Sequence, residues 1–531
     1  MNEGRLDAVI VGAGFAGLYA LHRLRGIGLA ARVFEAGGGV GGTWYWNRYP
    51  GARCDIESME YSYQFSDALQ QEWQWTERYA TQPEILRYAE HVADRFDLRR
   101  DIRLETRVVA ARYDEAEQRW RIETDRGDRV EARWCILATG CLSAANWPAI
   151  PGRERFSGRA WHTGHWPHEG VDFSGQSVAV VGTGSSGIQS IPLIAAQARS
   201  LHVFQRTPTY SVPAHNRPLD PAAADAIRAD YAAFRARNAL QPFGFGADLP
   251  RGEVGAQALE PAERRRAYEA AWARGGLPFL ATFPDLMLDP ASNETAAAFI
   301  RDKIRSIVRD PAVAERLCPT QVVGCKRLCV DTDYYATFNR ENVTLVDLRD
   351  EPIEAIEAEG IRTTRDSYPF DAIVFATGFD AMTGAIDRIA LHGRDGRTLG
   401  EKWSTGPRTY LGLATAGFPN LFLVTGPGSP SVLSNMLPSI EQHVDWIADC
   451  IAHVERSGRR TIEATRSAED AWVDHVNAVG DFTLFPRCSS WYLGANVPGK
   501  PRVFMPYVGF PAYVARCREV VEKGYEGFVL A

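Results

Sequence analysis

Six glycines, arranged as two copies of the pattern G-x-G-x-x-G, are the residues of this 531-residue chain whose spacing points most directly to chemistry. The first glycine permits a tight turn, the second lets backbone approach a pyrophosphate, and the third lets a helix pack closely on a strand. The following helix N-terminus attracts the phosphate charge. We therefore expect two dinucleotide sites, unless one turn is purely structural, at Gly12, Gly14 and Gly17 and at Gly182, Gly184 and Gly187.

The residues that follow each turn indicate which dinucleotide it binds. Glu35 follows the strand after the first turn, where a carboxylate accepts hydrogen bonds from ribose hydroxyls and repels a 2′-phosphate. The equivalent position after the second turn holds Gln205, followed by Arg206 and Thr207. An arginine accommodates a 2′-phosphate through charge-assisted hydrogen bonds. The first site therefore suits FAD and the second NADPH, unless Arg206 is an ordinary solvated surface residue.

Residues 156–167, between the two turns, fit the pattern F-x-G-x-x-x-H-T-x-x-W-P. This pattern is the fingerprint of the Baeyer–Villiger monooxygenases, and the chain resembles that family over essentially its whole length. Other segments typical of the family, in part of its phenylacetone monooxygenase branch, are residues 42–51, 51–58, 326–327, 376–380, 490–492 and 494–501. The resemblance implies NADPH- and O2-dependent oxidation of ketones to esters or lactones through an FAD C4a-peroxide, with sulfide oxidation as a side activity.

The resemblance also assigns cofactor-binding roles to particular positions. Around FAD it places Gly12, Gly14, Gly17, Glu35, Thr43, Trp44, Trp46, Asp55, Tyr61, Val108 and Met436. Around NADP it places Arg53, Thr183, Gly184, Ser185, Ser186, Gly187, Gln189, Arg206, Thr207, Lys326, Arg327 and Trp491. The aromatic residues in both sets are open to a second interpretation, as ordinary core packing.

Two charged residues carry the implied catalysis, with Arg327 above the flavin and Asp55 as its carboxylate partner. The oxygen donor has to stay an anion in order to attack a carbonyl carbon. A guanidinium favours that anion, because it keeps its charge at any working pH and donates several hydrogen bonds. The same cation would stabilise the oxyanion of the adduct. A structural ion pair is the alternative for both residues, and for His162 of the fingerprint we prefer a structural role.

Positioning these residues requires a strand, a turn and a helix for each dinucleotide. Strand patterns lie at 8–11, 31–35, 177–181, 201–204, 343–346 and 372–375, and helical patterns recur at 261–275, 295–309 and 439–454. We expect an α/β fold with two Rossmann-type dinucleotide-binding domains and an inserted helical subdomain. The expected segments are FAD domain 1–142, NADP domain 143–217, helical insertion 218–325, NADP domain 326–379 and FAD domain 380–531.

Composition narrows the possible partners. Hydrophobic residues make up 45% and charged residues 24%, as in globular proteins, and the net charge of -7 offers no basic surface for nucleic acid. The nine cysteines lack zinc or C-x-x-C spacing, so we expect no metal and no disulfide, and assign no redox role to Cys325 and Cys329. No segment is typical of a signal peptide or membrane span. We expect a cytoplasmic enzyme whose partners are a ketone and O2. The sequence does not predict the oligomeric state, and a monomer is compatible with it.

Three other functions share some of these features. A reductase of disulfides or quinones has both glycine turns but not the fingerprint, and a nucleotide-binding protein without turnover has no need of Arg327 and Asp55. The nearest alternative is a flavin-containing N- or S-monooxygenase, whose fingerprint is similar. The native ketone is not predicted. Cys141 stands where the phenylacetone monooxygenase branch has a glutamine, and the loop at 431–436 is longer than in enzymes that resemble cyclohexanone monooxygenase.

Overall fold

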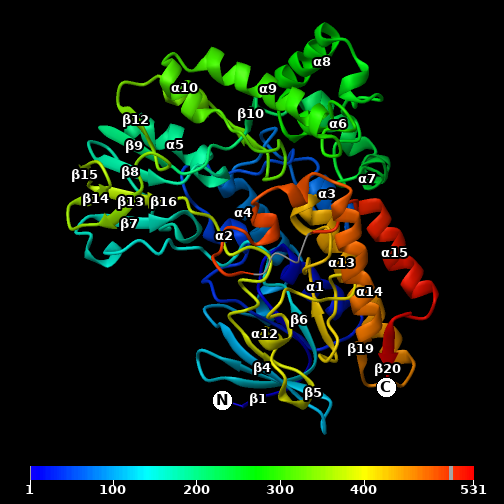
Figure 1. Cartoon of the computed structure of the whole chain (residues 1–531). Helices are drawn as coiled ribbons and strands as arrows, with labels where there is room; N and C mark the ends of the chain where they lie inside the picture. Colours follow the sequence, from blue (N-terminus) through cyan, green and yellow to red (C-terminus); the bar gives the residue numbers. More distant parts are fainter. Residues whose placement is uncertain (1, 501–505) are drawn as a thin grey trace.

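A computed structural model of the chain describes residues 2–500 and 506–531 (Figure 1). Pro501, the last residue of the family-like segment 494–501, lies outside them. Two separate sheets each carry a glycine turn, a helical layer stands at the top of Figure 1, and the C-terminal helices lie at the right. The expected α/β fold with two Rossmann-type units is confirmed, and the five-segment division stays a prediction.

The first sheet has eight strands, and its centre is parallel. Its order is β17-β4-β5-β6-β1-β2-β3, with β18 also paired to β6. Strand β1 pairs in parallel with β2 and β6, while β4, β5 and β6 form an antiparallel meander. The strands are β1 (Asn2–Val11), β2 (Ala31–Phe34), β3 (Ile102–Arg103), β4 (Val108–Asp114), β5 (Arg119–Thr124), β6 (Arg129–Leu137), β17 (Ala390–His392) and β18 (Leu421–Leu423).

The second sheet has five parallel strands in the order β12-β9-β8-β16-β7. A three-stranded antiparallel sheet, β13-β14-β15, follows β12 in the chain. The strands are β7 (Arg159–His162), β8 (Ser177–Val181), β9 (Ser200–Gln205), β12 (Val343–Asp347), β13 (Ile353–Ile356), β14 (Gly360–Thr363), β15 (Ser367–Pro369) and β16 (Ala372–Phe375). Strand β10 (Ser211–Pro213) pairs with β11 (Cys329–Asp331) and so joins the two ends of the helical layer.

Helices cover both sheets and form the layer between β10 and β11. The helices of that layer are α6 (Pro221–Ala229), α7 (Tyr231–Ala239), α8 (Pro261–Arg274), α9 (Pro290–Ile307) and α10 (Pro311–Leu317). The glycine turns lead into α1 (Phe15–Gly26) and α5 (Ser185–Gln197). The others are α2 (Thr43–Trp46), α3 (Asp67–Glu72), α4 (Gln82–Arg95), α11 (Tyr334–Thr337), α12 (Leu399–Lys402), α13 (Met436–Arg456), α14 (Arg466–Asp481) and α15 (Phe510–Glu522), beside the antiparallel pair β19 (Ile462–Ala464) and β20 (Phe528–Leu530).

Both glycine turns depend on missing side chains in the same way. Gly12 has φ +103, and a Cβ there would lie 2.6 Å from the Ala138 carbonyl oxygen, just after β6. Gly182 has φ +113, and its Cβ would collide with the Ala376 carbonyl, just after β16. A Cβ on Gly17 would collide with the Gly12 carbonyl oxygen in turn. Each turn therefore presses against the neighbouring central strand, which only glycine permits.

Element boundaries differ from the expected ones where capping residues decide them. Helix α13 begins at Met436 rather than 439, because the Asn435 side chain accepts a hydrogen bond from the N–H of Leu437 (3.3 Å). Helix α9 begins at Pro290 rather than 295, because Asp289 caps the N–H of Ser292 (2.8 Å). Among the described residues, no helix is long and apolar enough to cross a membrane.

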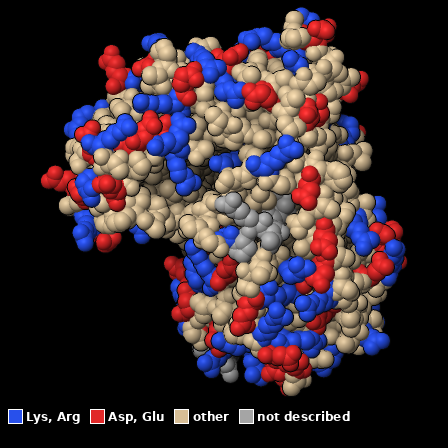
Figure 2. Space-filling model, viewed as in Figure 1, with Lys and Arg blue, Asp and Glu red and all other residues tan. Residues whose placement is uncertain are grey.

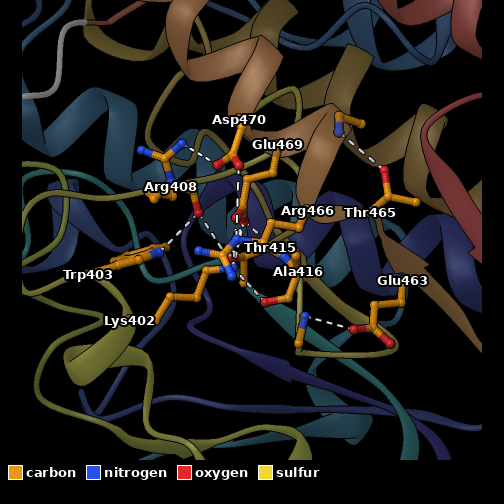
Figure 3. A network of polar contacts seen from close by, with 12 residues as sticks. Lys402, Trp403, Arg408, Thr415, Ala416, Glu463, Thr465, Arg466, Glu469 and Asp470 are labelled. Carbon is orange, nitrogen blue, oxygen red and sulfur yellow. Dashed lines mark hydrogen bonds and ion pairs between the residues drawn. The ribbon is translucent and has the colours of Figure 1, made fainter.

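A buried ion pair joins α12 to α14 (Figure 3). The Lys402 ammonium donates to both oxygens of Glu469 at 2.8 Å, and both side chains are more than nine-tenths buried. The Thr415 hydroxyl and the Ala416 N–H also donate to Glu469, each at 2.9 Å. Burial lowers the pKa of Lys402, and the Glu469 charge opposes that shift. The carboxylate therefore keeps the ammonium charged inside the protein.

We expect Glu469→Gln to lower the free energy of unfolding by about 3–5 kcal/mol, because it leaves the Lys402 charge buried without a partner. Urea unfolding followed by circular dichroism measures the change. Asp470→Asn, on the same helix but in a partly exposed pair with Arg408, is the matched control and should change stability by less than about 1 kcal/mol. Equal effects of the two substitutions would contradict the importance of the buried pair.

Candidate active site

The Glu35 carboxylate lies directly after β2, beside the first glycine turn. It is only 5% exposed, and its oxygens accept hydrogen bonds from the N–H groups of Ala13 and Gly37, each at 2.7 Å. One contact holds the glycine turn and the other holds the segment after β2. Each carboxylate oxygen keeps lone-pair capacity for a further donor. The arrangement fits an acceptor for ribose hydroxyls.

The backbone at Gly14, the N-cap of α1, faces the backbone of Gly42 at the start of α2. A Cβ on Gly42 would lie 2.8 Å from the Gly14 Cα, and a Cβ on Gly14 would lie 3.4 Å from the Gly42 Cα. Gly42 also has φ +53, in the left-handed region. Two glycines therefore face each other at the N-terminus of α1, where free backbone N–H groups and the helix dipole favour a pyrophosphate.

The expected aromatic neighbours of the flavin gather on and around α2. Trp44 is buried, and its Nε1–H donates to the Tyr61 hydroxyl at 3.1 Å. Burial raises the pKa of Tyr61, which keeps its hydroxyl protonated. Thr43 begins α2, and Trp46 ends it with its ring 5.8 Å from that of His165 in the fingerprint. The remaining two expected neighbours are the first residues of β4 and α13, Val108 and Met436.

The second glycine turn is contacted by the fingerprint. The Thr163 and Ser186 hydroxyl oxygens lie 3.1 Å apart, and the Ser185 hydroxyl oxygen lies 3.3 Å from the Cys329 sulfur. A Cβ on Gly184 would meet nothing within 4 Å, so the space before α5 is open. The turn is therefore held from one side and accessible at the helix N-terminus, where a phosphate group would bind.

Two cations stand beyond this turn without an acidic partner. Arg206 follows β9 and is exposed, and Thr183 fixes that point by donating to the Thr207 carbonyl at 3.2 Å. Burial lowers the pKa of Lys326, and the nearby charge of Arg206 acts in the same direction. Neither Arg206 nor Lys326 makes an ion pair within the described ranges. On the surface as a whole, Figure 2 shows Lys and Arg side chains along the recess beside the second sheet. Such a pair suits an anionic group.

Arg327, the residue after Lys326, makes a bidentate ion pair with Asp55. Its Nε and Nη2 atoms donate to the two carboxylate oxygens, each at 2.8 Å, and Nη1 donates to the Val432 carbonyl at 2.9 Å. The Tyr492 hydroxyl lies close enough to the guanidinium for each group to shift the pKa of the other. Segments from three parts of the chain therefore converge on one cation.

The environment of Arg327 keeps it charged. Burial alone would lower the pKa of the guanidinium, but the charge and hydrogen bonds of Asp55 outweigh burial and hold that pKa above its usual value. Burial also raises the pKa of Tyr492 to about 12, although the nearby Arg327 opposes the shift. A permanent cation next to a neutral hydroxyl can stabilise negative charge on oxygen.

Gln189 and Arg53, both expected near NADP, connect the two units. The Tyr49 hydroxyl donates to the Gln189 side-chain oxygen at 2.9 Å, and the Gln189 amide donates to the Arg53 carbonyl at 3.2 Å. The Arg53 guanidinium lies 3.3 Å from a carboxylate oxygen of Glu77. In this structure, therefore, the Gln189 side chain is directed at the loop of the first unit.

An apolar wall stands beside Arg327. Trp491 begins a short 3-10 helix, Trp491–Leu493, and its ring centroid lies 4.3 Å from that of Tyr492. The wall contains Cys141, Met382, Val432, Leu433, Phe485 and Tyr492. Sequence reasoning missed three of these. Tyr492 carried a signal, because it follows Trp491 in a family-like segment, but Met382 and Phe485 lie in no motif.

His162 ends β7 inside the second sheet and is fully buried. Its Nδ1 accepts a hydrogen bond from the Gly164 N–H at 2.9 Å. Burial, together with nearby His165, lowers the pKa of His162 to about 4, so the ring is neutral near pH 7. The other ring nitrogen, Nε2, is buried without a hydrogen-bond partner among the described residues, so the structural role of His162 stays a prediction.

Comparison with known proteins agrees with this geometry. The family described as pyridine nucleotide-disulphide oxidoreductase matches residues 9–228, the stretch that contains both glycine turns. A Baeyer-Villiger monooxygenase of Pseudooceanicola batsensis is 43% identical over 98% of this chain and 96% of its own length. A phenazine N-monooxygenase of Lysobacter antibioticus is 42% identical over 100% and 98%.

A solved structure extends the likeness to three dimensions. An oxidized steroid monooxygenase bound to NADP is 54% identical, covers 99% of both chains and superposes with a TM-score of 0.94. That likeness and the match to the Pseudooceanicola enzyme each span nearly the whole chain. The chain therefore belongs to the Baeyer–Villiger monooxygenase family.

Proposed function

We propose that this protein uses FAD, NADPH and O2 to convert a ketone into an ester or lactone. The observation that carries the proposal is the partly buried, bidentate Arg327–Asp55 pair, placed where the two dinucleotide units meet. When bound, FAD takes hydride from NADPH and activates O2 for oxygen insertion next to the carbonyl. The protein has to hold both cofactors, exclude water and place a cation.

Separate groups would hold the two cofactors. For FAD, the Glu35 carboxylate accepts from the ribose, the facing backbones of Gly14 and Gly42 receive the pyrophosphate, and Trp44 and Tyr61 pack near the ring system. For NADPH, the N-terminus of α5 at Gly184 receives the pyrophosphate. Arg206 and Lys326 bind the 2′-phosphate, and Thr207, Ser185, Ser186 and Trp491 complete the site.

Arg327 stabilises negative charge on oxygen during insertion. Its position is set by Asp55 and the Val432 carbonyl, so little reorganisation is needed when charge develops. The apolar wall of Cys141, Leu433 and Phe485 excludes water, which favours transfer to the ketone over release of hydrogen peroxide. Asp55 is a positioning residue in this scheme, because it acts through Arg327.

Oxygenation of nitrogen or sulfur is the second candidate, because a relative of nearly equal identity is named for N-oxidation of a phenazine. The wall is apolar, with one buried thiol at Cys141, so its residue types suit a planar heteroaromatic ring as well as a ketone. Sulfide oxidation is proposed as a side activity of the same site. The nature of the product separates the two candidates.

We expect purified protein with FAD, NADPH and O2 to form esters or lactones from aryl, open-chain and cyclic ketones, and to form phenazine N-oxide at a much lower kcat/KM. Gas chromatography and mass spectrometry identify both products in one incubation. Efficient N-oxide formation without ester would replace the first candidate by the second.

Arg206→Ala should raise the KM for NADPH by about tenfold or more and leave the KM for NADH nearly unchanged, because only NADPH carries the 2′-phosphate. Lys326→Ala should act in the same direction. The matched control is Arg199→Ala, an exposed arginine of the same unit that faces Asp371. Steady-state rates of NADPH and NADH oxidation measure the effect, and equal losses with both cofactors would move the phosphate site elsewhere.

Arg327→Ala should lower ester formation by about 100- to 1000-fold, since a preorganised charge donor is removed. Flavin should remain bound and NADPH oxidation should persist, with hydrogen peroxide replacing the ester. Arg327→Lys should restore little, because one ammonium cannot reproduce the fork that reaches both Asp55 oxygens and the Val432 carbonyl together. Arg305→Ala, which breaks an exposed pair with Glu315, is the control. Near-normal ester yield from Arg327→Ala would place the essential cation elsewhere.

A further inference from the structure

A buried arginine, Arg78, joins the first dinucleotide unit to the helical layer. It lies between α3 and α4 and is only 5% exposed. Its Nε and Nη2 atoms donate to one carboxylate oxygen of Glu57, at 2.9 and 2.7 Å. Its Nη1 atom donates to the Ala214 carbonyl, directly after β10, at 3.2 Å and to the Arg274 carbonyl, at the end of α8, at 2.8 Å. One side chain therefore holds three separate segments.

Backbone contacts also fix residues 52–58, the Asp55 loop, to the stretch around Arg78. The Cys54 N–H donates to the Ala80 carbonyl at 3.1 Å, and the Ser58 N–H donates to the Arg78 carbonyl at 2.8 Å. These two contacts lie on either side of the carboxylate that pairs with the catalytic arginine. The position of that carboxylate therefore depends on the stretch around Arg78.

The same stretch contacts the segment that follows β10. The Arg78 N–H donates to the Arg217 carbonyl at 2.9 Å, and the Tyr79 N–H donates to the Asn216 side-chain oxygen at 3.0 Å. The guanidinium of Arg78 adds its contact with the beginning of this segment. Main chain and side chain therefore hold the two segments together at several points.

The contacts continue from the segment after β10 to Arg327. Strand β10 pairs in parallel with β11, and the Ala214 N–H extends this pairing by donating to the Asp331 carbonyl at 2.7 Å. Strand β11 begins at Cys329, two residues after Arg327. The contacts thus form a path from the Asp55 loop, through the stretch around Arg78, to β11. The ion pair of Arg327 with Asp55 closes this path.

We propose that Arg78 is a positioning residue for the pair of Arg327 with Asp55. The inference depends on the proposed oxygen insertion, in which the guanidinium has to lie at a fixed place beside the reacting oxygen. The ion pair holds its two partners together, but either segment could still carry the pair away from that place. Arg78 removes this freedom, because it holds both segments from the side opposite to the pair.

An arginine suits this position, because its planar fork donates in several directions at once and a lysine ammonium does not. Arg78→Lys should keep FAD bound and lower the kcat for ester formation by about 10- to 100-fold, since a displacement of about 1 Å at a reacting centre costs a rate factor of that order. The KM for NADPH should stay nearly unchanged. Glu57→Gln, which removes the charge of the main acceptor, should act in the same direction with a smaller effect.

The ratio of products separates positioning from a general loss of folded protein. Loss of folded protein would lower ester formation and NADPH oxidation equally, and so would leave the ester yield per NADPH unchanged. A displaced Arg327 should instead lower that yield and raise the release of hydrogen peroxide. Gas chromatography of the ester, absorbance of NADPH and a peroxide assay measure the three quantities in one incubation.

Hydrogen exchange of the FAD-loaded protein, followed by mass spectrometry, tests the position of the pair without any turnover. In Arg78→Lys, peptides that cover the Asp55 loop and residues 325–331 should exchange faster than in the parent protein, because both segments lose a contact that restricts local opening. Peptides from residues 439–454, inside α13, should exchange at the parent rate.

Arg237→Lys is the matched control. Arg237 also makes a bidentate pair, with both oxygens of Asp248 at 3.0 Å, but on the exposed surface of the helical layer. This variant should change neither the ester yield nor the exchange of the two peptides.

The proposal is overturned if Arg78→Lys keeps the ester yield per NADPH of the parent protein, or if neither peptide exchanges faster. It is also overturned if exchange rises equally in α13. Should Arg78→Lys fail to bind FAD, Glu57→Gln decides by the same two measurements. If the parent protein forms no ester, the proposed function fails, and the exchange of the two peptides alone decides whether Arg78 positions the pair.

Discussion

The partly buried pair between Arg327 and Asp55 is the contact on which the rest of the candidate site depends. A guanidinium withdrawn from water is costly unless a carboxylate and further acceptors replace the lost hydration, and here Asp55 and the Val432 carbonyl do so. Because 272 residues separate the two partners, the pair forms only when the segment before β11 docks against the loop after Gly51. The proposed catalytic charge and the attachment of these two segments are therefore one interaction.

The two dinucleotide units have the same backbone arrangement at the glycine turn, and they differ in the charge of the side chains beside it. Gly12 and Gly182 press against the ends of β6 and β16 in the same manner, so the shape of each phosphate cradle is nearly the same. Discrimination then falls to side chains after the second strand of each unit. A buried carboxylate at Glu35 disfavours an added phosphate, whereas Arg206 and Lys326, two cations without acidic partners in the described structure, favour one.

Local patterns in the sequence predicted the parts of the fold that short-range rules determine. The strand at 372–375 and the helices after both glycine turns lie where expected, because periodicity and glycine spacing act over a few residues. The meander β4-β5-β6 was not expected, since its stability comes from neighbours in the sheet.

The apolar wall of the proposed substrate site could not be predicted from the sequence, because the loop that forms it also contacts the proposed catalytic cation. Ser431 is fully buried with φ +43, a conformation that costs a non-glycine residue about 1–3 kcal/mol and persists only where surroundings enforce it. The next residue, Val432, gives its carbonyl to Arg327 and its side chain to the apolar wall. A change in this loop that enlarged the pocket would therefore also move an acceptor of the guanidinium. Substrate choice and charge placement are coupled through one backbone carbonyl, so neither follows from residue types alone.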